Sequence, residues 1–197
     1  MSVRVKLCDL KTSERENIIK KLKVVQKETE YNKFSTPPTI YPYDIVGDDE
    51  NGEIYLPMYW ALTNITLASR KPREDYTNIK CNFAGSLRPL QKQVKKEAIE
   101  ELNKFGTCIL SLYTGAGKTI TSINIACKIG LKCVIICHRL ILIDQWKDAI
   151  NAVVKCARIQ ILKSKAELKP NIDFYIVNAQ NVPKWERGSF DDIGLVI

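Results

Sequence analysis

From residue 107 onward, short apolar runs alternate with stretches of helical periodicity. The predicted strands lie at 107–113, 132–137, 158–162, 173–177 and 193–197, and the predicted helices at 117–128 and 140–153. Strands that alternate with helices pair in parallel, because each connection must cross back over the sheet. The pattern therefore predicts an α/β fold, in which a parallel sheet carries helices on both faces.

Two domains are expected. Residues 1–80 form a predicted small α+β accessory domain, a linker is expected near 70–86, and 87–197 form the α/β domain. Residues 1–86 hold 13 Lys and Arg against 12 Asp and Glu, whereas 87–197 hold 17 against 10. The basic excess of the second domain favours a polyanionic partner such as nucleic acid.

A charged helix is predicted over 13–30. Ser13 is its expected N-cap, and Glu16, three residues later, would complete a capping box. A single apolar stripe on this helix predicts that it packs against other parts of the domain, through Ile18, Ile19, Leu22 and Val25.

A glycine-rich loop separates the first predicted strand from the first predicted helix. Its glycines allow a sharp turn that points backbone N–H groups at an anion, and the helix N-terminus adds partial positive charge. The Lys118 ammonium would bind the β and γ phosphates of a nucleotide, and the Thr119 hydroxyl would bind Mg²⁺. These two residues are the predicted catalytic pair. The predicted nucleotide-binding residues of the loop are Thr114, Gly115, Ala116, Gly117, Lys118 and Thr119.

The loop resembles that of superfamily 2 helicases, which keep its T-G-x-G-K-T core and accept Leu112 where other phosphate loops have glycine. Upstream, the sequence L-R-P-L-Q resembles the family's adenine-binding motif. The resemblance implies that Gln91 binds the adenine edge with Arg88 in support, since an amide offers both a donor and an acceptor. Leu90 replaces a frequent aromatic residue, which removes the stacking partner of the base. A RecA-like fold, with ATP and Mg²⁺ as cofactors, follows from the same resemblance.

Two later strand ends resemble the family's nucleic-acid-binding motifs. His138 and Arg139 follow one strand, and a guanidinium can bind a backbone phosphate with two hydrogen bonds. Asn178 and Gln180 follow another strand; the family usually has threonine in place of Asn178, but an amide can also bind a phosphate. The resemblance therefore implies nucleic-acid contacts at these four residues.

The last predicted strand resembles the approach to the family's D-E-x-H or D-E-A-D carboxylates, which hold Mg²⁺ and orient the attacking water. The sequence reaches Ile197 before such carboxylates, so we expect an incomplete RecA-like domain that binds ATP weakly and hydrolyses almost none. The full-length protein is expected to be an ATP-dependent helicase or translocase. The loop and the following H-R-L segment are similar to the transcript-release helicases of large DNA viruses and to a eukaryotic transcription-factor DNA translocase. That similarity implies a DNA-dependent role in viral transcription.

Three alternatives remain open at this stage. The enzyme could act on RNA, and residues 1–86 could be an adaptor that binds a protein of the transcription machinery. The chain could also be a small-molecule kinase, which Leu112 and the segment 88–91 disfavour.

The seven cysteines form no C-x-x-C pair, so we expect reduced thiols that pack as small apolar groups and no zinc site. The sequence has neither a secretory signal nor a membrane-length apolar run. An intracellular, reducing location is expected, in the host cytoplasm or a virion if the protein is viral.

Overall fold

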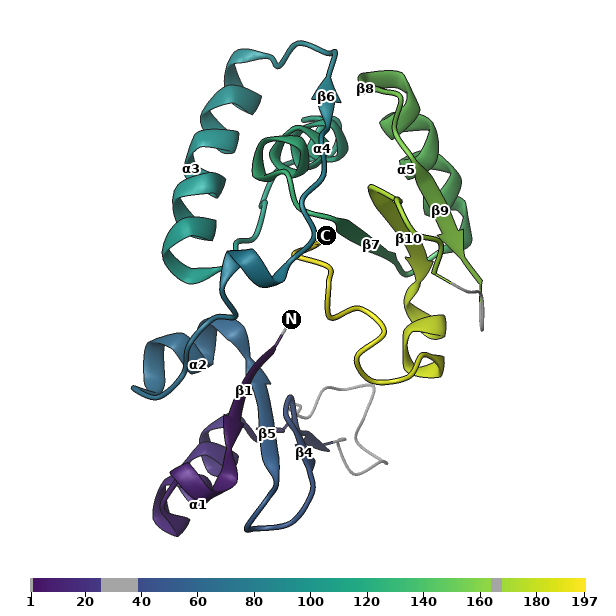
Figure 1. Cartoon of the computed structure of the whole chain (residues 1–197). Coiled ribbons are helices and arrows are strands. Elements are labelled where there is room, and N and C mark those ends of the chain that lie inside the picture. Colours follow the sequence, from purple (N-terminus) through teal and green to yellow (C-terminus); the bar gives the residue numbers. More distant parts are fainter. Residues whose placement is uncertain (1, 26–38, 164–167) are drawn as a thin grey trace, which may run out of the picture. The chain divides into compact units, whose positions relative to one another are not determined.

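The computed structural model describes residues 2–25, 39–163 and 168–197, and the chain divides into two compact units (Figure 1). The first unit comprises Met1–Arg70 together with Phe105–Thr107. The second comprises Lys71–Lys104 and Cys108–Ile197. The division falls between Arg70 and Lys71.

The first unit contains an antiparallel sheet in the order β1-β5-β4, formed by β1 (Ser2–Lys6), β5 (Glu53–Pro57) and β4 (Asp44–Val46). Val3 and Val5 of β1 face the core, and they pair with Leu56 and Ile54 of β5. This alternation of buried and exposed residues leaves one apolar face to cover. Strand β1 is one that we did not predict from the sequence.

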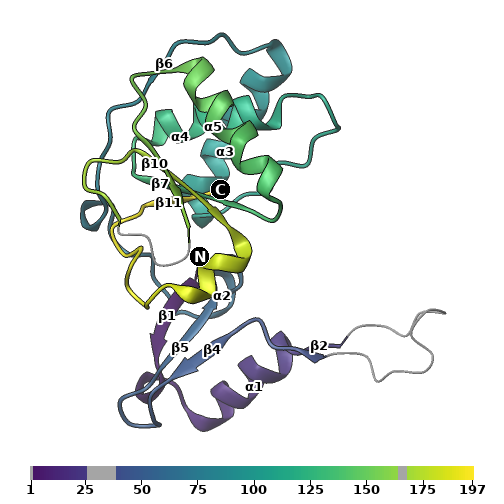
Figure 2. The same cartoon turned by 90° about the vertical axis from the view of Figure 1, so that its right-hand side faces the viewer.

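Helices α1 (Thr12–Leu22) and α2 (Met58–Asn64) belong to the same unit as these strands (Figure 2). Their residues Ile18, Leu22 and Ala61 are buried in one core with the strands. A short 3-10 turn, η1 (Leu7–Asp9), joins β1 to α1. Strands β2 (Val24–Val25) and β3 (Thr39–Ile40) pair as a separate ribbon. The unit is therefore α+β, as the sequence predicts.

Helix α1 begins one residue before the predicted N-cap. Its N-cap is Lys11, whose backbone N–H donates to the Glu14 carboxylate at 2.9 Å, so the prediction of Ser13 and Glu16 as the capping pair is wrong. The register shifts because Glu14 lies three residues after Lys11 and can close the same bond. The helix ends at Leu22, since the β-branched Val24–Val25 pair with β3; residues 26–30 lie outside the described part of the chain.

The second unit is built on a four-stranded parallel sheet in the order β11-β7-β10-β9. Its strands are β7 (Cys133–Cys137), β9 (Ile159–Leu162), β10 (Phe174–Asn178) and β11 (Leu195–Val196). All five residues of β10 are buried, as expected for a central strand that is covered on both faces. The α/β fold with a RecA-like parallel sheet is confirmed.

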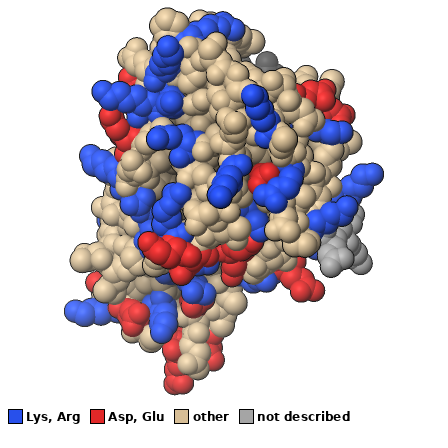
Figure 3. Space-filling model, turned by 45° about the horizontal axis from the view of Figure 1, so that its top comes forward, with Lys and Arg blue, Asp and Glu red and all other residues tan. Residues whose placement is uncertain are grey.

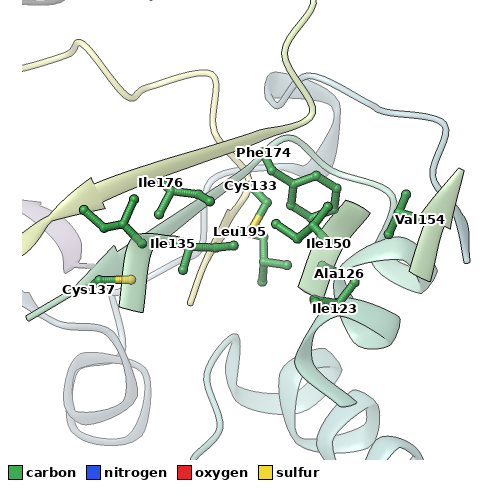
Figure 4. Packing of buried hydrophobic residues seen from close by; sticks show 11 residues of the cluster. Ile123, Ala126, Cys133, Ile135, Cys137, Ile150, Val154, Phe174, Ile176 and Leu195 are labelled. Atoms are coloured by element: carbon green, nitrogen blue, oxygen red, sulfur yellow. The ribbon is translucent and has the colours of Figure 1, made fainter. Parts of the chain in front are cut away.

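One face of this sheet packs against α4 (Lys118–Ile129) and α5 (Leu140–Val153), as Figure 4 shows. The buried side chains that meet there include Ile123, Ala126 and Ile150 from the helices and Cys133, Ile135, Phe174 and Ile176 from the strands. Helix α4 ends where Gly130 adopts a left-handed conformation, with φ +69°. The opposite face is covered by the 3-10 helix η4 (Ala179–Lys184) and by Trp185 and Phe190.

The cysteines fall into three classes of burial, and Cys81, Cys108 and Cys127 are half-buried. Cys133 and Cys137 are buried in the sheet and pack as small apolar side chains, as predicted, whereas Cys8 and Cys156 are exposed. All seven are free thiols.

Residues 71–86 are joined to the second unit by backbone hydrogen bonds. The Thr77 N–H donates to the Asp192 carbonyl at 3.0 Å, and the Thr77 carbonyl accepts from the Lys132 N–H at 2.8 Å. Strand β6 (Asn82–Phe83) then pairs with β8 (Val154–Lys155). The segment from η3 (Arg73–Asp75) to β6 therefore belongs to the α/β unit, which also contains most of α3 (Pro89–Phe105).

The prediction of a buried strand at 107–113 is wrong. Cys108, Leu110 and Leu112 are half-buried and alternate with exposed residues, so one side of the segment is covered. Ile109, however, is 92% exposed and Tyr113 is 70% exposed. A strand also needs a hydrogen-bonded neighbour, and no strand of the described residues pairs with this segment. The apolar composition alone could not reveal that missing neighbour.

Two isoleucines from predicted strands test this difference. Ile176 is fully buried in β10, so Ile176→Ala should lower the free energy of unfolding by about 2–5 kcal/mol. Ile109→Ala should change it by less than about 0.5 kcal/mol, because the side chain is already in water. Urea unfolding followed by circular dichroism measures both, and an Ile109→Ala loss equal to that of Ile176→Ala would contradict the fold described here.

Candidate phosphate-binding site

The glycine-rich loop turns the chain from the extended segment 107–113 into α4. Gly115 and Gly117 both have φ +85°, in the left-handed region that favours glycine. A Cβ at Gly115 would meet nothing within 4 Å, whereas a Cβ at Gly117 would lie 2.3 Å from Nε2 of Gln91. The left-handed backbone alone favours glycine at position 115. At position 117 the close approach of the Gln91 amide favours glycine as well.

The start of α4 supplies the positive end of the site. The first-turn N–H groups of an α-helix have no partner within the helix, and the N-cap residue Gly117 has no side chain that could accept from those of α4. The Lys118 ammonium donates to the carbonyls of Leu112, at 2.8 Å, and Tyr113, at 3.0 Å. The cation is therefore held beside the loop, and Lys118, Thr114 and Gly115 are exposed.

Gln91 lies directly beside the glycine-rich loop, as its resemblance to the family's adenine-binding motif predicts. Its side chain is 3% exposed. Its Oε1 accepts from the Arg88 backbone N–H at 2.8 Å, and its Nε2 donates to the Gly117 carbonyl at 3.4 Å. The Arg88 side chain is exposed. The structure thus brings Gln91 to the loop, but it engages both ends of the amide with protein backbone.

Thr121 also contacts the loop, and we did not predict it from the sequence. It is fully buried in the first turns of α4, and its hydroxyl donates to the Gly117 carbonyl at 3.0 Å. Its position four residues after Gly117 is the only available signal, because a threonine in a helix can donate to the carbonyl four residues earlier.

The four predicted nucleic-acid contacts gather at the carboxyl edge of the sheet. Cys137 and Asn178 are opposite each other in the β7–β10 register, so the residues after these strands emerge at the same edge. His138, Arg139 and Gln180 are exposed. Asn178 is buried, and its Oδ1 accepts from the Gln180 N–H at 2.9 Å, which caps η4.

Positively charged side chains lie on other parts of the surface as well as at Arg139. Figure 3 shows Lys and Arg side chains distributed over the face in view, among uncharged atoms and several patches of Asp and Glu. A dispersed excess of this kind raises the general affinity for polyanions without marking a path for one.

Three of the thiols are not activated nucleophiles. Burial raises the pKa of Cys108, Cys133 and Cys137, so these side chains remain protonated at neutral pH. The site can hold an anion, but these cysteines offer it no thiolate.

In the described ranges, no three His, Cys, Asp or Glu side chains gather as a metal site. A hard cation such as Mg²⁺ often takes only one or two protein ligands and completes its shell with phosphate oxygens and water. The partly buried Thr119 hydroxyl, next to Lys118, fits that limited role. No helix in the described residues has the length and apolarity needed to cross a membrane.

Comparison with known proteins agrees with this geometry. Residues 84–192 match the family described as "Type III restriction enzyme, res subunit". "Putative helicase 161L" of Invertebrate iridescent virus 6 is 40% identical over 132 residues, which cover 64% of this chain and 30% of that protein. "Putative helicase 109L" of Invertebrate iridescent virus 3 is 32% identical over 155 residues, which cover 74% and 47%.

A protein of Acanthamoeba polyphaga mimivirus, named as a putative ATP-dependent RNA helicase, is 29% identical over 117 residues, or 58% of this chain and 22% of the relative. The chain thus spans less than half the length of each of these relatives. The family match begins at residue 84, just before α3, and covers the phosphate loop and the parallel sheet. This chain therefore belongs to the Type III restriction enzyme res-subunit family, and with it to the superfamily 2 helicases that its motifs resemble.

Proposed function

We propose that this chain is the ATP-binding part of a DNA-dependent ATPase that acts as a helicase or translocase. The observation that carries the proposal is the loop between residue 113 and α4. Two left-handed glycines, an N-cap without a side-chain partner and the Lys118 ammonium converge there. Each of these features favours a polyphosphate, through N–H groups, helix dipole and full charge respectively.

ATP would enter this loop with its phosphates over the α4 N-terminus. The backbone of Thr114–Gly117 would surround the phosphates, and Lys118 would exchange the carbonyls of Leu112 and Tyr113 for the β and γ oxygens. Thr119 would hold Mg²⁺ together with those oxygens. Gln91, in the first turn of α3, and Arg88, which immediately precedes that helix, are the proposed neighbours of the adenine.

The strand ends would carry the nucleic acid. Arg139 is the strongest proposed contact, because its exposed guanidinium can bind a phosphate with two hydrogen bonds. His138, Asn178 and Gln180 lie at the same carboxyl edge. The family resemblance favours DNA, whereas the printed name of the mimivirus relative favours RNA as the alternative.

Hydrolysis is proposed to need residues other than these 197. The sequence contains neither D-E-A-D nor D-E-x-H, so it supplies no such carboxylate pair for Mg²⁺ and the attacking water. The names of the iridovirus relatives are consistent with a viral helicase, and we propose a role in viral transcription inside the reducing environment of a cell or virion.

A matched pair of lysines on α4 tests the phosphate site. Lys118→Ala should weaken binding of Mg²⁺-ATP by roughly 10- to 100-fold, because one phosphate-binding cation is lost. Lys128→Ala, at the exposed far end of the same helix, should change it by less than twofold. Isothermal titration gives both affinities. ATP turnover by the 197-residue chain should not exceed that of Lys118→Ala, and a clear excess would refute the proposed need for further residues.

The nucleic-acid partner is tested on the full-length protein. Duplex DNA should stimulate its steady-state ATP turnover, and Arg139→Ala should weaken that DNA binding and reduce the slope of log affinity against log salt by about one. Lys147→Ala, on an exposed position of α5, is the control. Stimulation by RNA and not by DNA would replace the first proposal with the RNA-directed one.

A second candidate function concerns residues 1–86, which we propose to be a docking element for a protein partner. Apolar side chains are unusually exposed on β2, β3 and β4, including Val25, Ile40 and Ile45. Residues 39–69 also contain five acidic residues and no Lys or Arg, which disfavours nucleic acid as their partner.

An apolar-to-charged substitution tests this candidate. Ile45→Asp should abolish capture of transcription-machinery proteins by the full-length protein, because a buried unpaired charge opposes docking. Leu67→Asp, at an exposed leucine of the same unit outside β4, should leave capture unchanged. Capture by the wild type and the two variants is measured by affinity purification and mass spectrometry. Equal capture by all three would show that β4 does not take part in docking.

A further inference from the structure

The carbonyl oxygen of Gly117 accepts hydrogen bonds from two other segments of the site. Thr121 donates to it twice, through its backbone N–H and its hydroxyl, each at 3.0 Å. Nε2 of Gln91 donates to it from α3 at 3.4 Å, the longest and weakest of the three bonds. Both donor residues are almost fully buried, so water does not compete for these bonds.

The contacts around Gly117 are close-packed. A Cβ added at this glycine would lie 2.3 Å from Nε2 of Gln91, so the amide occupies the place of a side chain there. The other end of that amide accepts from the Arg88 N–H, one residue before α3 begins. Gln91 therefore joins the start of α3 to the phosphate loop.

Because a peptide unit is planar, the hydrogen bonds to its carbonyl also fix the direction of its N–H. The Gly117 carbonyl and the Lys118 N–H belong to one trans peptide unit, in which the two groups point in opposite directions. Donors that hold the carbonyl towards the interior consequently aim the Lys118 N–H outwards, to the mouth of the loop. This N–H is also among the first-turn groups of α4 that have no partner within the helix.

We propose that Thr121 and Gln91 are positioning residues, which fix the Gly117–Lys118 peptide so that its N–H meets a phosphate oxygen. The proposal rests on the proposed function, since it assumes that a polyphosphate occupies the loop. In this role Gln91 supports phosphate binding whatever base is attached, because both polar ends of its amide are engaged by the protein backbone. An amide that selects adenine would have to offer the base its second N–H and its second lone pair, because the protein backbone engages one of each.

Affinity for three ligands separates a positioning role from a base-reading role. Mg²⁺-ATP, Mg²⁺-GTP and Mg²⁺-triphosphate, which carries no base, are titrated into the chain and its variants. Thr121→Val removes the hydroxyl with little change of volume and should weaken all three ligands by the same factor, about two- to tenfold. Thr121→Ser keeps the hydroxyl and should restore wild-type affinity within twofold.

Gln91→Met, which removes the amide at similar length, should also weaken the three ligands by a common factor. If the methionine variant fails to fold, Gln91→Glu replaces it in the test. This variant keeps the acceptor for the Arg88 N–H but loses the donor to the Gly117 carbonyl, so it should also weaken the three ligands by a common factor. Circular dichroism identifies the folded variants. Amide exchange at position 121, whose N–H donates to the Gly117 carbonyl, is measured by NMR in the ligand-free protein and should become faster in Thr121→Val, because the peptide is less firmly held.

Three results would overturn the proposal. Unchanged affinity and exchange in Thr121→Val would show that the hydroxyl does not position the peptide. A Gln91 variant that loses ATP affinity but keeps triphosphate affinity would show that this side chain reads the base. Failure of the folded wild-type chain to bind any of the three ligands would instead reject the phosphate site itself, and the positioning role with it.

Discussion

The pairing of β7 with β10 is the interaction on which the second unit depends. Five residues of each strand are in register, from Cys133 opposite Phe174 to Cys137 opposite Asn178. Because side chains alternate along a strand, this one pairing supplies both hydrophobic cores of the unit. Ile135 and Ile176 face α4 and α5, while neighbouring residues face η4.

Parallel pairing also determines where polar residues can gather. All the strand ends of one kind lie at one edge, so the residues that follow β7 and β10 are brought together although they are far apart in sequence. The opposite edge is closed by ion pairs. Arg158 holds the buried Asp173 carboxylate with two side-chain bonds, of 2.6 and 3.0 Å, and Lys132 pairs with Asp192. The edge that carries Arg139 is left to solvent.

The sequence predicted best those elements whose signals are local. The bounds of α5 are the predicted ones, and α4 is shifted by one residue, because periodicity and flanking glycines mark helix ends. The segment 107–113 has the composition of a strand, but strand formation depends on a neighbour that composition does not encode. β1 was missed because its five residues alternate apolar and polar side chains over too short a span to stand out.

In the candidate site, too, the residues with a local sequence signal were predicted and those without one were not. Its glycines and Lys118 could be found because a phosphate loop needs those residue types in that order, whereas Thr121 has no such signature within a helix. Gln91 was found by its motif, but its burial and its backbone partners became visible only in three dimensions.

The difference between the two loop glycines has a consequence for how this sequence can vary. Position 115 demands only a left-handed backbone with open space around it, and asparagine or aspartate tolerates that conformation at modest cost. Position 117 demands the same backbone and also the absence of any side chain, because the Gln91 amide occupies the place of its Cβ. The first glycine can therefore be replaced without a change elsewhere, whereas a replacement at the second also displaces the Gln91 amide from the Gly117 carbonyl.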